Sequence, residues 1–515
     1  MNMRCFKALS LTILLISYGN ESFAQAKFIA SGITLGEWPE SLYFVDLDGD
    51  SRKDLIIPSW QQSTGRELHV YLQQANGRFP DRPSRLVEIK PEIIAIAFAD
   101  LRPEPGHELL LIAANAVFSL SSAIPSYSDN LKPLFEWDLV AAVPDRRQIH
   151  VFPPLIDFNG DGFSDLLLPG LEEYGVFLGG PEESFALAHR FNTVNENLDP
   201  SDIPLGSARL NTDLSINERD GIVLRVTARG ASAFDDFVND WERDDQEALL
   251  SSRQWRPSAV SRRMNEDSRP DIVYMNIGDD LYGQINILLQ DQSGGFPAQP
   301  QWQGPIDTRG DIRLMDVNAD SQTDIVRIIN RSNEWDVQLF LNKGASFNLQ
   351  TPDQVMKFSG YDLDISVVDL QQNGQRQLSV SYYTIPVVNA VRNASIVRSQ
   401  LLFQQGSGGQ VFTTRPDFKL DQNFSAEALR GLSAQMNLQA DVDNDGRTDA
   451  VYVTEDGTLA AKSIDASLRI SDTPFWQYVP ERSIMNFGVE DINGDGVSDF
   501  YLRHSSALTV LVSQP

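Results

Sequence analysis

Short apolar runs alternate with polar and glycine-rich stretches along almost the whole chain. In 157–170, DFNGDGFSDLLLPG, an acidic stretch leads into three leucines and a Pro-Gly break. Other runs, such as VQLFLNKGASF, combine an apolar stretch, a polar turn and a phenylalanine. Apolar runs of this length between turn residues are typical of β-strands, and helical periodicity is scarce. The pattern therefore predicts a chain built almost entirely of short β-strands.

The acidic stretch recurs in register. Five copies fit Asp-x-(Asp/Asn)-x-Asp-(Gly/Ser)-x-x-Asp before an apolar run, and they begin at Asp46, Asp157, Asp316, Asp441 and Asp491. Incomplete copies begin at Asp100, Arg263 and Asp369, and a weak ninth candidate begins at Thr212. Successive copies start about 50 to 57 residues apart, with one longer interval between 369 and 441. A period that persists from end to end indicates one repeat architecture rather than several unrelated domains.

Each repeat has room for four strands, in the order strand, acidic loop, strand, short loop, strand, turn, strand. This is the size of a propeller blade. We therefore predict an all-β fold, a β-propeller of four-stranded blades, eight in number within a range of seven to nine. Pairing of N-terminal with C-terminal strands would close the ring and remove exposed edges. Residues 25–515 are predicted to form this single domain, with insertions near 234–252, an amphipathic helical pattern, and near 386–400.

The first 24 residues have a different character. Arg4 and Lys7 precede the apolar run ALSLTILLIS, and small residues follow in ESFAQA. This arrangement is typical of a secretory signal peptide, so we expect an exported protein, periplasmic or extracellular. No later apolar run approaches the roughly 20 residues of a membrane-spanning helix, so we expect no membrane insertion. Because the only cysteine is Cys5, the exported chain needs a large core or a cross-link other than a disulfide.

The formal net charge of −29 makes nucleic acids and anionic membrane surfaces poor partners. Metal cations suit such an excess of carboxylates, although a solvated acidic surface accounts for many of the scattered ones. In the acidic loop, side-chain oxygens at positions 1, 3, 5 and 9 and the carbonyl of position 7 can supply about five ligands, which suits Ca²⁺. An EF-hand would need glutamate at position 12, where this chain has Ile57, Leu168, Arg327, Tyr452 or Leu502. A loop in which aspartate hydrogen-bonds its own backbone remains the alternative.

The loops resemble the FG-GAP/VCBS repeats of bacterial secreted proteins and of the integrin alpha-chain head, over nearly the whole chain after the signal peptide. The resemblance implies a β-propeller with about five structural Ca²⁺ ions in its blade hairpins. The side-chain ligands would be Asp46, Asp48, Asp50 and Asp54; Asp157, Asn159, Asp161 and Asp165; Asp316, Asn318, Asp320 and Asp324; Asp441, Asp443, Asp445 and Asp449; and Asp491, Asn493, Asp495 and Asp499. The carbonyl ligands would be those of Arg52, Phe163, Gln322, Arg447 and Val497. We expect the three incomplete loops to be metal-free.

Motifs of catalysis are scarce. The sequence contains no Gly-x-Ser-x-Gly, no His-Glu-x-x-His and no phosphate-binding loop, and its five histidines are scattered. A carboxylate pair for polysaccharide cleavage stays open, but no pair stands out from the acidic loops. We therefore expect a protein that is not an enzyme.

The resemblance to integrin heads also implies a partner on the face opposite the calcium loops. Aromatic residues in stretches assigned to that face could anchor a protein or stack on a sugar, with core packing as the competing role; they are Trp38, Trp60, Tyr174, Tyr282 and Trp335. We predict a secreted, monomeric, calcium-stabilised scaffold that binds a protein or carbohydrate ligand. The alternative is a polysaccharide-acting enzyme, a lyase or hydrolase, on the same propeller.

Overall fold

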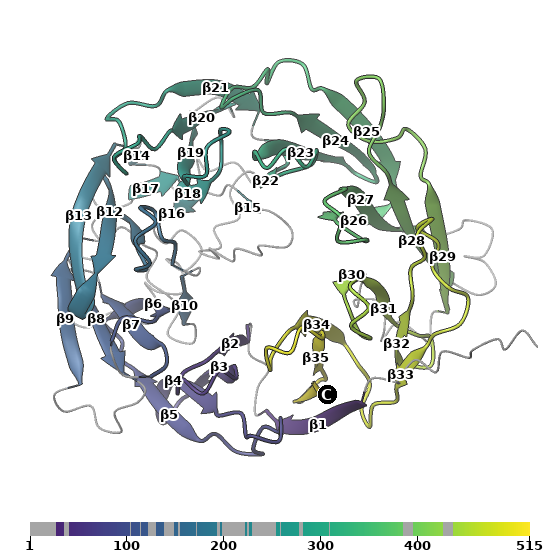
Figure 1. The fold of residues 1–515 in the computed structure, drawn as a ribbon, viewed down its shortest axis with the longest axis horizontal. Helices are drawn as coiled ribbons and strands as arrows, with labels where there is room; N and C mark the ends of the chain where they lie inside the picture. The colour runs from purple at the N-terminus through teal and green to yellow at the C-terminus, as the bar shows by residue number, and fades with distance from the viewer. Residues whose placement is uncertain are drawn as a thin grey trace, which may run out of the picture.

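The strands form a closed ring of blades around a central axis (Figure 1). The computed structural model describes residues 27–35, 41–102, 105–113, 115–121, 130–138, 149–152, 155–170, 173–192, 196–197, 222–223, 226–228, 254–257, 259–277, 282–307, 309–384, 395–425 and 436–514. Within these residues the only helical element is η1 (Pro181–Glu183), a single 3₁₀ turn. None of the described helical structure is long and apolar enough to cross a membrane.

Eight antiparallel blades follow one another along the chain, which confirms the predicted fold class and blade number. Blade 1 holds β2 (Tyr43–Val45), β3 (Asp54–Gln61), β4 (Gly65–Tyr71) and β5 (Arg85–Ile89). Blade 2 holds β6 (Ile93–Ala99), β7 (Glu108–Ala113), β8 (Ala116–Ser121) and β9 (Leu131–Glu136). Blade 3 holds the bridge of Ile156 with Asp165, β11 (Leu166–Pro169), β12 (Tyr174–Gly180) and β13 (Ser184–Phe191). Blade 4 holds β18 (Ala259–Arg262), β19 (Asp271–Ile277), β20 (Tyr282–Leu288) and β21 (Trp302–Asp307).

The second half of the ring repeats this plan. Blade 5 holds β22 (Asp311–Met315), β23 (Asp324–Arg331), β24 (Glu334–Phe340) and β25 (Gln354–Ser359). Blade 6 holds β26 (Tyr361–Val368), β27 (Gln377–Thr384), β28 (Ser395–Phe403) and β29 (Phe418–Ser425). Blade 7 holds β30 (Asn437–Ala440), β31 (Asp449–Val453), β32 (Leu459–Lys462) and β33 (Trp476–Tyr478). Blade 8 holds β34 (Asn486–Glu490), β35 (Asp499–Arg503), β36 (Ala507–Gln514) and β1 (Lys27–Thr34).

The ring closes through blade 8, as predicted. β1 from the N-terminal end pairs antiparallel with the last strand, β36, from Lys27 opposite Gln514 to Thr34 opposite Ala507. Phe28 of β1 packs between Trp476 and Phe500, with ring centroids 4.9 and 5.5 Å away. The first strand of the chain therefore completes the last blade and covers the edge that β36 would otherwise expose.

Between blades 3 and 4, the residues that the structure describes do not form a ninth blade. The start of the weak repeat at Thr212 and the predicted helix at 234–252 lie outside the described residues. The described parts are β14 (Glu196–Asn197), β16 (Val226–Ala228) and β17 (Gln254–Pro257), which form a small sheet, and β15 (Ile222–Val223), which pairs with β22 on the axis side of blade 5. β10 (His150–Val151) pairs parallel with β6 of blade 2. In the predicted insertion near 386–400, residues 395–400 belong to β28 and residues 386–394 lie outside the described part.

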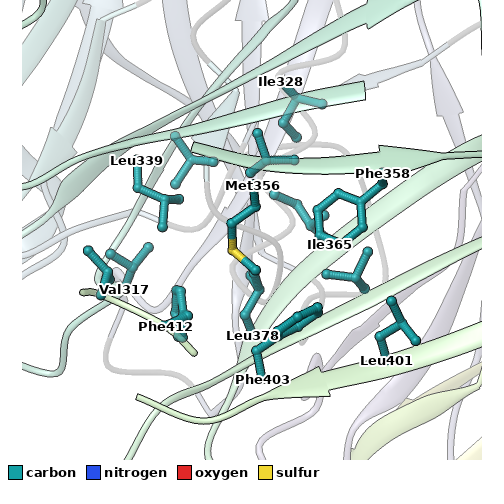
Figure 2. Packing of buried hydrophobic residues seen from close by; sticks show 14 of the residues in the cluster. Val317, Ile328, Leu339, Met356, Phe358, Ile365, Leu378, Leu401, Phe403 and Phe412 are labelled. Atoms are coloured by element: carbon teal, nitrogen blue, oxygen red, sulfur yellow. The ribbon is translucent and has the colours of Figure 1, made fainter. Parts of the chain in front are cut away.

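The core is divided among the blade junctions. Eight clusters of buried apolar side chains are present, and each lies between two neighbouring blades. Figure 2 shows the cluster between blades 5 and 6, where Met356 and Phe358 face Leu378 and Phe403. Alternate residues of a second strand serve opposite junctions, since Leu55 of β3 packs toward blade 8 and Ile56 toward blade 2. Both faces of a blade are buried, which explains the continuous apolar runs of the sequence.

Candidate metal centres

The acidic loops occupy equivalent places in every blade. Each connects the first strand to the second, and its ninth residue is the first residue of the second strand or directly precedes it. Because the strands of a blade are antiparallel, these loops share one face of the ring with the turns between the third and fourth strands. The hairpins between second and third strands, and the connections that enter each blade, lie on the opposite face.

The backbone of the loops explains their glycines. The fourth and sixth residues have positive φ angles, 74° at Gly49 and 68° at Ser51 in the first loop. The loop that begins at Asp316 adopts the same conformation with Ala319 at 64° and Ser321 at 66°. Glycine and asparagine adopt this left-handed region at little cost. The loop therefore turns sharply at these two positions, which explains why small residues or asparagine occupy them.

The first aspartate of each complete loop accepts hydrogen bonds from backbone N–H groups of the same loop. The carboxylate of Asp46 accepts hydrogen bonds from the backbone N–H groups of Gly49 at 2.7 Å and Ser51 at 2.8 Å. Asp157 accepts from Gly160 and Gly162 at 2.6 and 2.8 Å. The fifth residue likewise accepts the N–H of the seventh, as Asp50 does from Arg52 at 2.9 Å. These are the self-bonded aspartate turns of the alternative interpretation, and the remaining lone pairs of the same oxygens stay available to a cation.

The ninth residue has a structural role that the sequence pattern did not reveal. Asp54 is fully buried, and its two carboxylate oxygens accept the N–H groups of Leu47 at 3.0 Å and Gln73 at 2.9 Å. Asp271 and Asp324 make the same pair of contacts in blades 4 and 5. The residue thereby ties the loop to the end of the third strand. This explains why the ninth position stays polar in loops predicted to be metal-free, as Glu108 in blade 2 and Gln377 in blade 6.

Burial raises the pKa of these ninth-position carboxyl groups. Loss of hydration is the largest cause, and it outweighs the backbone hydrogen bonds that favour the ionised form. The pKa is raised to about 6 at Asp54, Asp165, Asp271 and Asp499, to about 7 at Asp324 and to about 8 at Asp449. A nearby cation would offset the lost hydration, so it would lower these pKa values and stabilise the ionised carboxylates.

The third residue divides the complete loops into two groups. Where it is asparagine, as in Asn159, its amide N–H donates to the fifth residue, Asp161, at 2.8 Å. Where it is aspartate, in the loops of Asp48 and Asp443, one carboxylate oxygen is buried and has no hydrogen-bond partner among the described residues. A buried oxygen that carries negative charge without a partner is costly. These two oxygens therefore mark places where a cation fits.

The two loops with a third aspartate also bring their carboxylates closest together. Oxygens of Asp46, Asp48 and Asp50 lie within 4.8 Å of one another, and so do oxygens of Asp441, Asp443 and Asp449. Burial, together with the neighbouring aspartates, raises the pKa of Asp443. Arginine stands at the seventh position in both loops, and the side chains of Arg52 and Arg447 pair with the fifth aspartate. The guanidinium balances part of the charge and leaves the third aspartate facing the cluster.

Two of the three incomplete loops, those at Arg263 and Asp100, have an arginine at a position where a complete loop has a ligand oxygen. In the loop at Arg263 the guanidinium of the first residue donates to the carbonyl of Asp267 at 2.7 Å. In the loop at Asp100 the third residue is Arg102, whose side chain is fully buried and pairs with Glu183 of blade 3 at 2.8 Å. A guanidinium at a position that would otherwise supply a ligand oxygen disfavours a metal ion there. The expectation that these loops are metal-free stays a prediction.

The five aromatic residues considered as ligand contacts differ in their burial. Tyr174 is 4% exposed and stacks on Phe191 at 5.3 Å, so of its two alternative roles core packing is the one that the structure supports. Trp335 is partly buried, and its indole N–H donates to the carbonyl of Gly360 at 2.9 Å. Trp60 is also partly buried. Trp38 and the side chain of Tyr282 lie outside the described part of the chain.

A pH-dependent contribution is expected from Asp271, which lies in a loop predicted to be metal-free. In the folded chain, burial raises the pKa of the Asp271 carboxyl group to about 6. In the unfolded chain an aspartate loses its proton near pH 4. The stabilisation by this group is therefore fully present below about pH 4 and is lost as pH rises through about 6. We expect Asp271→Asn, which cannot ionise, to gain about 2 to 3 kcal/mol relative to the wild type between pH 4 and 7.

The measurement is urea unfolding of both chains across this pH range at constant calcium. Glu266→Gln, a change at an exposed carboxylate in the same loop, is the matched control and should show no comparable trend. A difference between Asp271→Asn and wild type that does not change with pH would contradict the expectation.

Fold and loops together define an eight-bladed β-propeller with a ring of acidic loops on one face. No family model and no curated protein matches the sequence. Among solved structures, a lectin of Agrocybe aegerita that recognises non-reducing terminal N-acetylglucosamine is 12% identical over 78% of this chain and 90% of the lectin, with a TM-score of 0.38. BBS1N, solved in complex with ARL6DN, is 9% identical over 95% of this chain and 97% of its own, with a TM-score of 0.36. Similarities at this level carry no argument about what the chain binds.

Proposed function

We propose that this protein is an exported, calcium-stabilised propeller that serves as a binding scaffold for a protein or glycan ligand. The observation that carries the calcium part is the pair of buried, unpartnered oxygens of Asp48 and Asp443, each within an acidic cluster. All side-chain donors of the complete loops are hard oxygens, which suit Ca²⁺. The ion would neutralise the clustered carboxylates and stabilise the fold. Because the only cysteine is Cys5, no disulfide within the chain can provide such a cross-link.

The scaffold part rests on the difference between the two faces. The acidic loops form one face, where they repeat a common conformation and bond to their neighbours. The opposite face carries hairpins and blade-entering connections that do not repeat in sequence. Ligand recognition requires such variable positions on a rigid support. We therefore assign the ligand to the face opposite the acidic loops.

Calcium is expected to raise the thermal unfolding midpoint. A single site filled at 100 times its dissociation constant adds about 2.7 kcal/mol to the free energy of unfolding, so several sites should raise the midpoint by about 5 °C or more. The measurement is calorimetry of the full exported chain with excess calcium and with chelator, with magnesium as the ion control. An identical midpoint in all three conditions would rule the calcium role out.

Matched variants locate the effect in the loops. Asp48→Ala combined with Asp443→Ala removes the third-position oxygen, which asparagine supplies in the other three loops, from two of the five loops, and should remove part of the calcium-dependent rise. Asp291→Asn, a change in an exposed turn of blade 4, should preserve it.

Binding and turnover can be separated on the same protein. Incubation with a glycan array, followed by an assay for released reducing sugar, tests both. Retention of a glycan without sugar release supports the scaffold, and sugar release would support the polysaccharide-acting enzyme instead.

A further inference from the structure

The complete acidic loops are unevenly distributed around the ring. Those that begin at Asp441, Asp491 and Asp46 belong to blades 7, 8 and 1, which are direct neighbours across the ring closure. Those that begin at Asp157 and Asp316 belong to blades 3 and 5, and each stands between two incomplete loops. The ring thus contains one block of three adjacent complete loops and two isolated ones.

Adjacent loops are joined by backbone hydrogen bonds. In five junctions the N–H of a loop's eighth residue donates to the carbonyl of the first or second residue of the preceding loop. Within the block of three, Ser498 donates to Asp441 at 2.8 Å and Lys53 donates to Ile492 at 3.0 Å. The Ser498 hydroxyl also accepts the N–H of Asp441 at 3.0 Å.

Within the block of three, each of these bonds connects residues that are candidate ligands or directly adjoin one in the sequence. The backbone of Asp441 is bonded to Ser498, while its side chain is the first candidate ligand of its own loop. Ser498 directly precedes Asp499, the ninth residue of the next loop. A cation that orders one loop therefore also fixes the backbone group that bonds the neighbouring loop. This lowers the cost of ordering the neighbour, and by thermodynamic linkage a cation in the neighbour strengthens binding in the first loop equally.

We propose that cation binding is energetically coupled among the three loops at Asp441, Asp491 and Asp46, so that they fill and empty together and fasten the ring at its closure. The loops at Asp157 and Asp316 fill independently, because the loops beside them lack the residues to hold an ion. The same backbone bond is present at Thr323, which donates to the carbonyl of Arg263 at 2.8 Å, but there the preceding loop has no ion to respond. This inference rests on the proposed calcium function.

The chain itself suggests the variant that tests the coupling. The eighth position of the loop at Arg263 is Pro270, which has no N–H. Proline is therefore compatible with this position of the motif, and Ser498→Pro removes the bond to Asp441 while keeping every candidate ligand oxygen, although the Val497 carbonyl then belongs to a Val-Pro peptide bond. Ser498→Ala, which keeps the N–H and removes only the hydroxyl, is the matched control.

The readout is amide hydrogen exchange of the full exported chain during a titration with calcium alone, starting from chelator. A peptide that covers each loop reports the filling of that loop. In Ser498→Pro, the calcium concentration that half-protects the loops at Asp441 and Asp491 should rise about fivefold or more, within the usual range of coupling between sites. The loops at Asp157 and Asp316 should titrate as in the wild type, and Ser498→Ala should fall close to wild type.

A second pair of variants keeps the test independent of proline. Asp441→Asn should weaken calcium protection of the loop at Asp491, whereas Asp316→Asn should leave every other loop unchanged. The coupling is refuted if calcium protects all five loops but the loop at Asp491 titrates normally in both Ser498→Pro and Asp441→Asn. If calcium protects no loop of the wild-type chain, it is the proposed calcium function that fails.

Discussion

Arg102→Ala should lower the free energy of unfolding by about 3 kcal/mol, the lower end of the cost of breaking a buried ion pair, because Lys132 still pairs with Glu183. The Arg102 side chain has no exposed surface and pairs with Glu183 of the next blade at 2.8 Å. Its other N–H groups donate to Asn130 and Ser119. Burial would raise the pKa of Glu183, but hydrogen bonds from Lys132 and Ser119 and the charge of Arg102 hold that pKa below its ordinary value. The pair is thus charged, and removing the arginine leaves a buried carboxylate.

Urea unfolding at pH 7 measures the loss. Lys343→Ala, which removes an exposed partner of Asp353, should cost less than about 1 kcal/mol. Changing both partners, Arg102→Met with Glu183→Leu, should recover most of the stability because no unpaired charge remains. If Arg102→Ala costs no more than Lys343→Ala, the ion pair does not fasten blades 2 and 3 as described.

Removal of β1 should abolish cooperative folding. An exported chain that begins at Leu35 loses the strand that covers β36, together with buried Ile33 and the ring of Phe28. Burial of such side chains contributes about 1.5 to 3 kcal/mol each, so these two alone reach the lower end of the stability of a typical domain, about 5 kcal/mol. The exposed edge of β36 would in addition promote association between chains.

Size-exclusion chromatography and calorimetry of the truncated chain test this. The control keeps β1 and replaces the exposed residues Lys27 and Thr34 with alanine, which should preserve a sharp transition. A monomeric truncated chain with an unchanged midpoint would show that blade 8 is stable with three strands.

The fold was predictable because its signal repeats. Each blade carries the same polar loop at the same place, and the ninth polar residue marks the start of the second strand even where the metal pattern is lost, as at Gln377. Continuous apolar runs such as Leu55 to Ile57 follow from burial on both faces. The region after Phe191 was harder to interpret, because a weak repeat at Thr212 has the right spacing but the described residues between blades 3 and 4 form no further blade.

The candidate site was predictable only in part. Spacing within one loop indicates which oxygens can meet, as the clustered carboxylates of Asp46, Asp48 and Asp50 show. It could not show that Asp54 and its equivalents bond the end of the third strand, since that partner lies 19 residues away at Gln73. Nor could it show that Arg102 points into the junction between two blades. For Tyr174 the sequence left ligand contact and core packing open, because an aromatic residue at the end of a strand has the same local sequence whether its ring faces solvent or core.

The pairing of β1 with β36 has a consequence for how the molecule is encoded. Lys27 lies opposite Gln514, so the first and last described residues are neighbours in one blade, and the described strands form a closed circle. Each blade contacts its two neighbours, and the junction between the last and first blades has a core of the same kind as the others. The position of the chain ends within the ring is therefore structurally arbitrary. The order of the blades around the ring, and not the blade in which the chain starts, determines the fold.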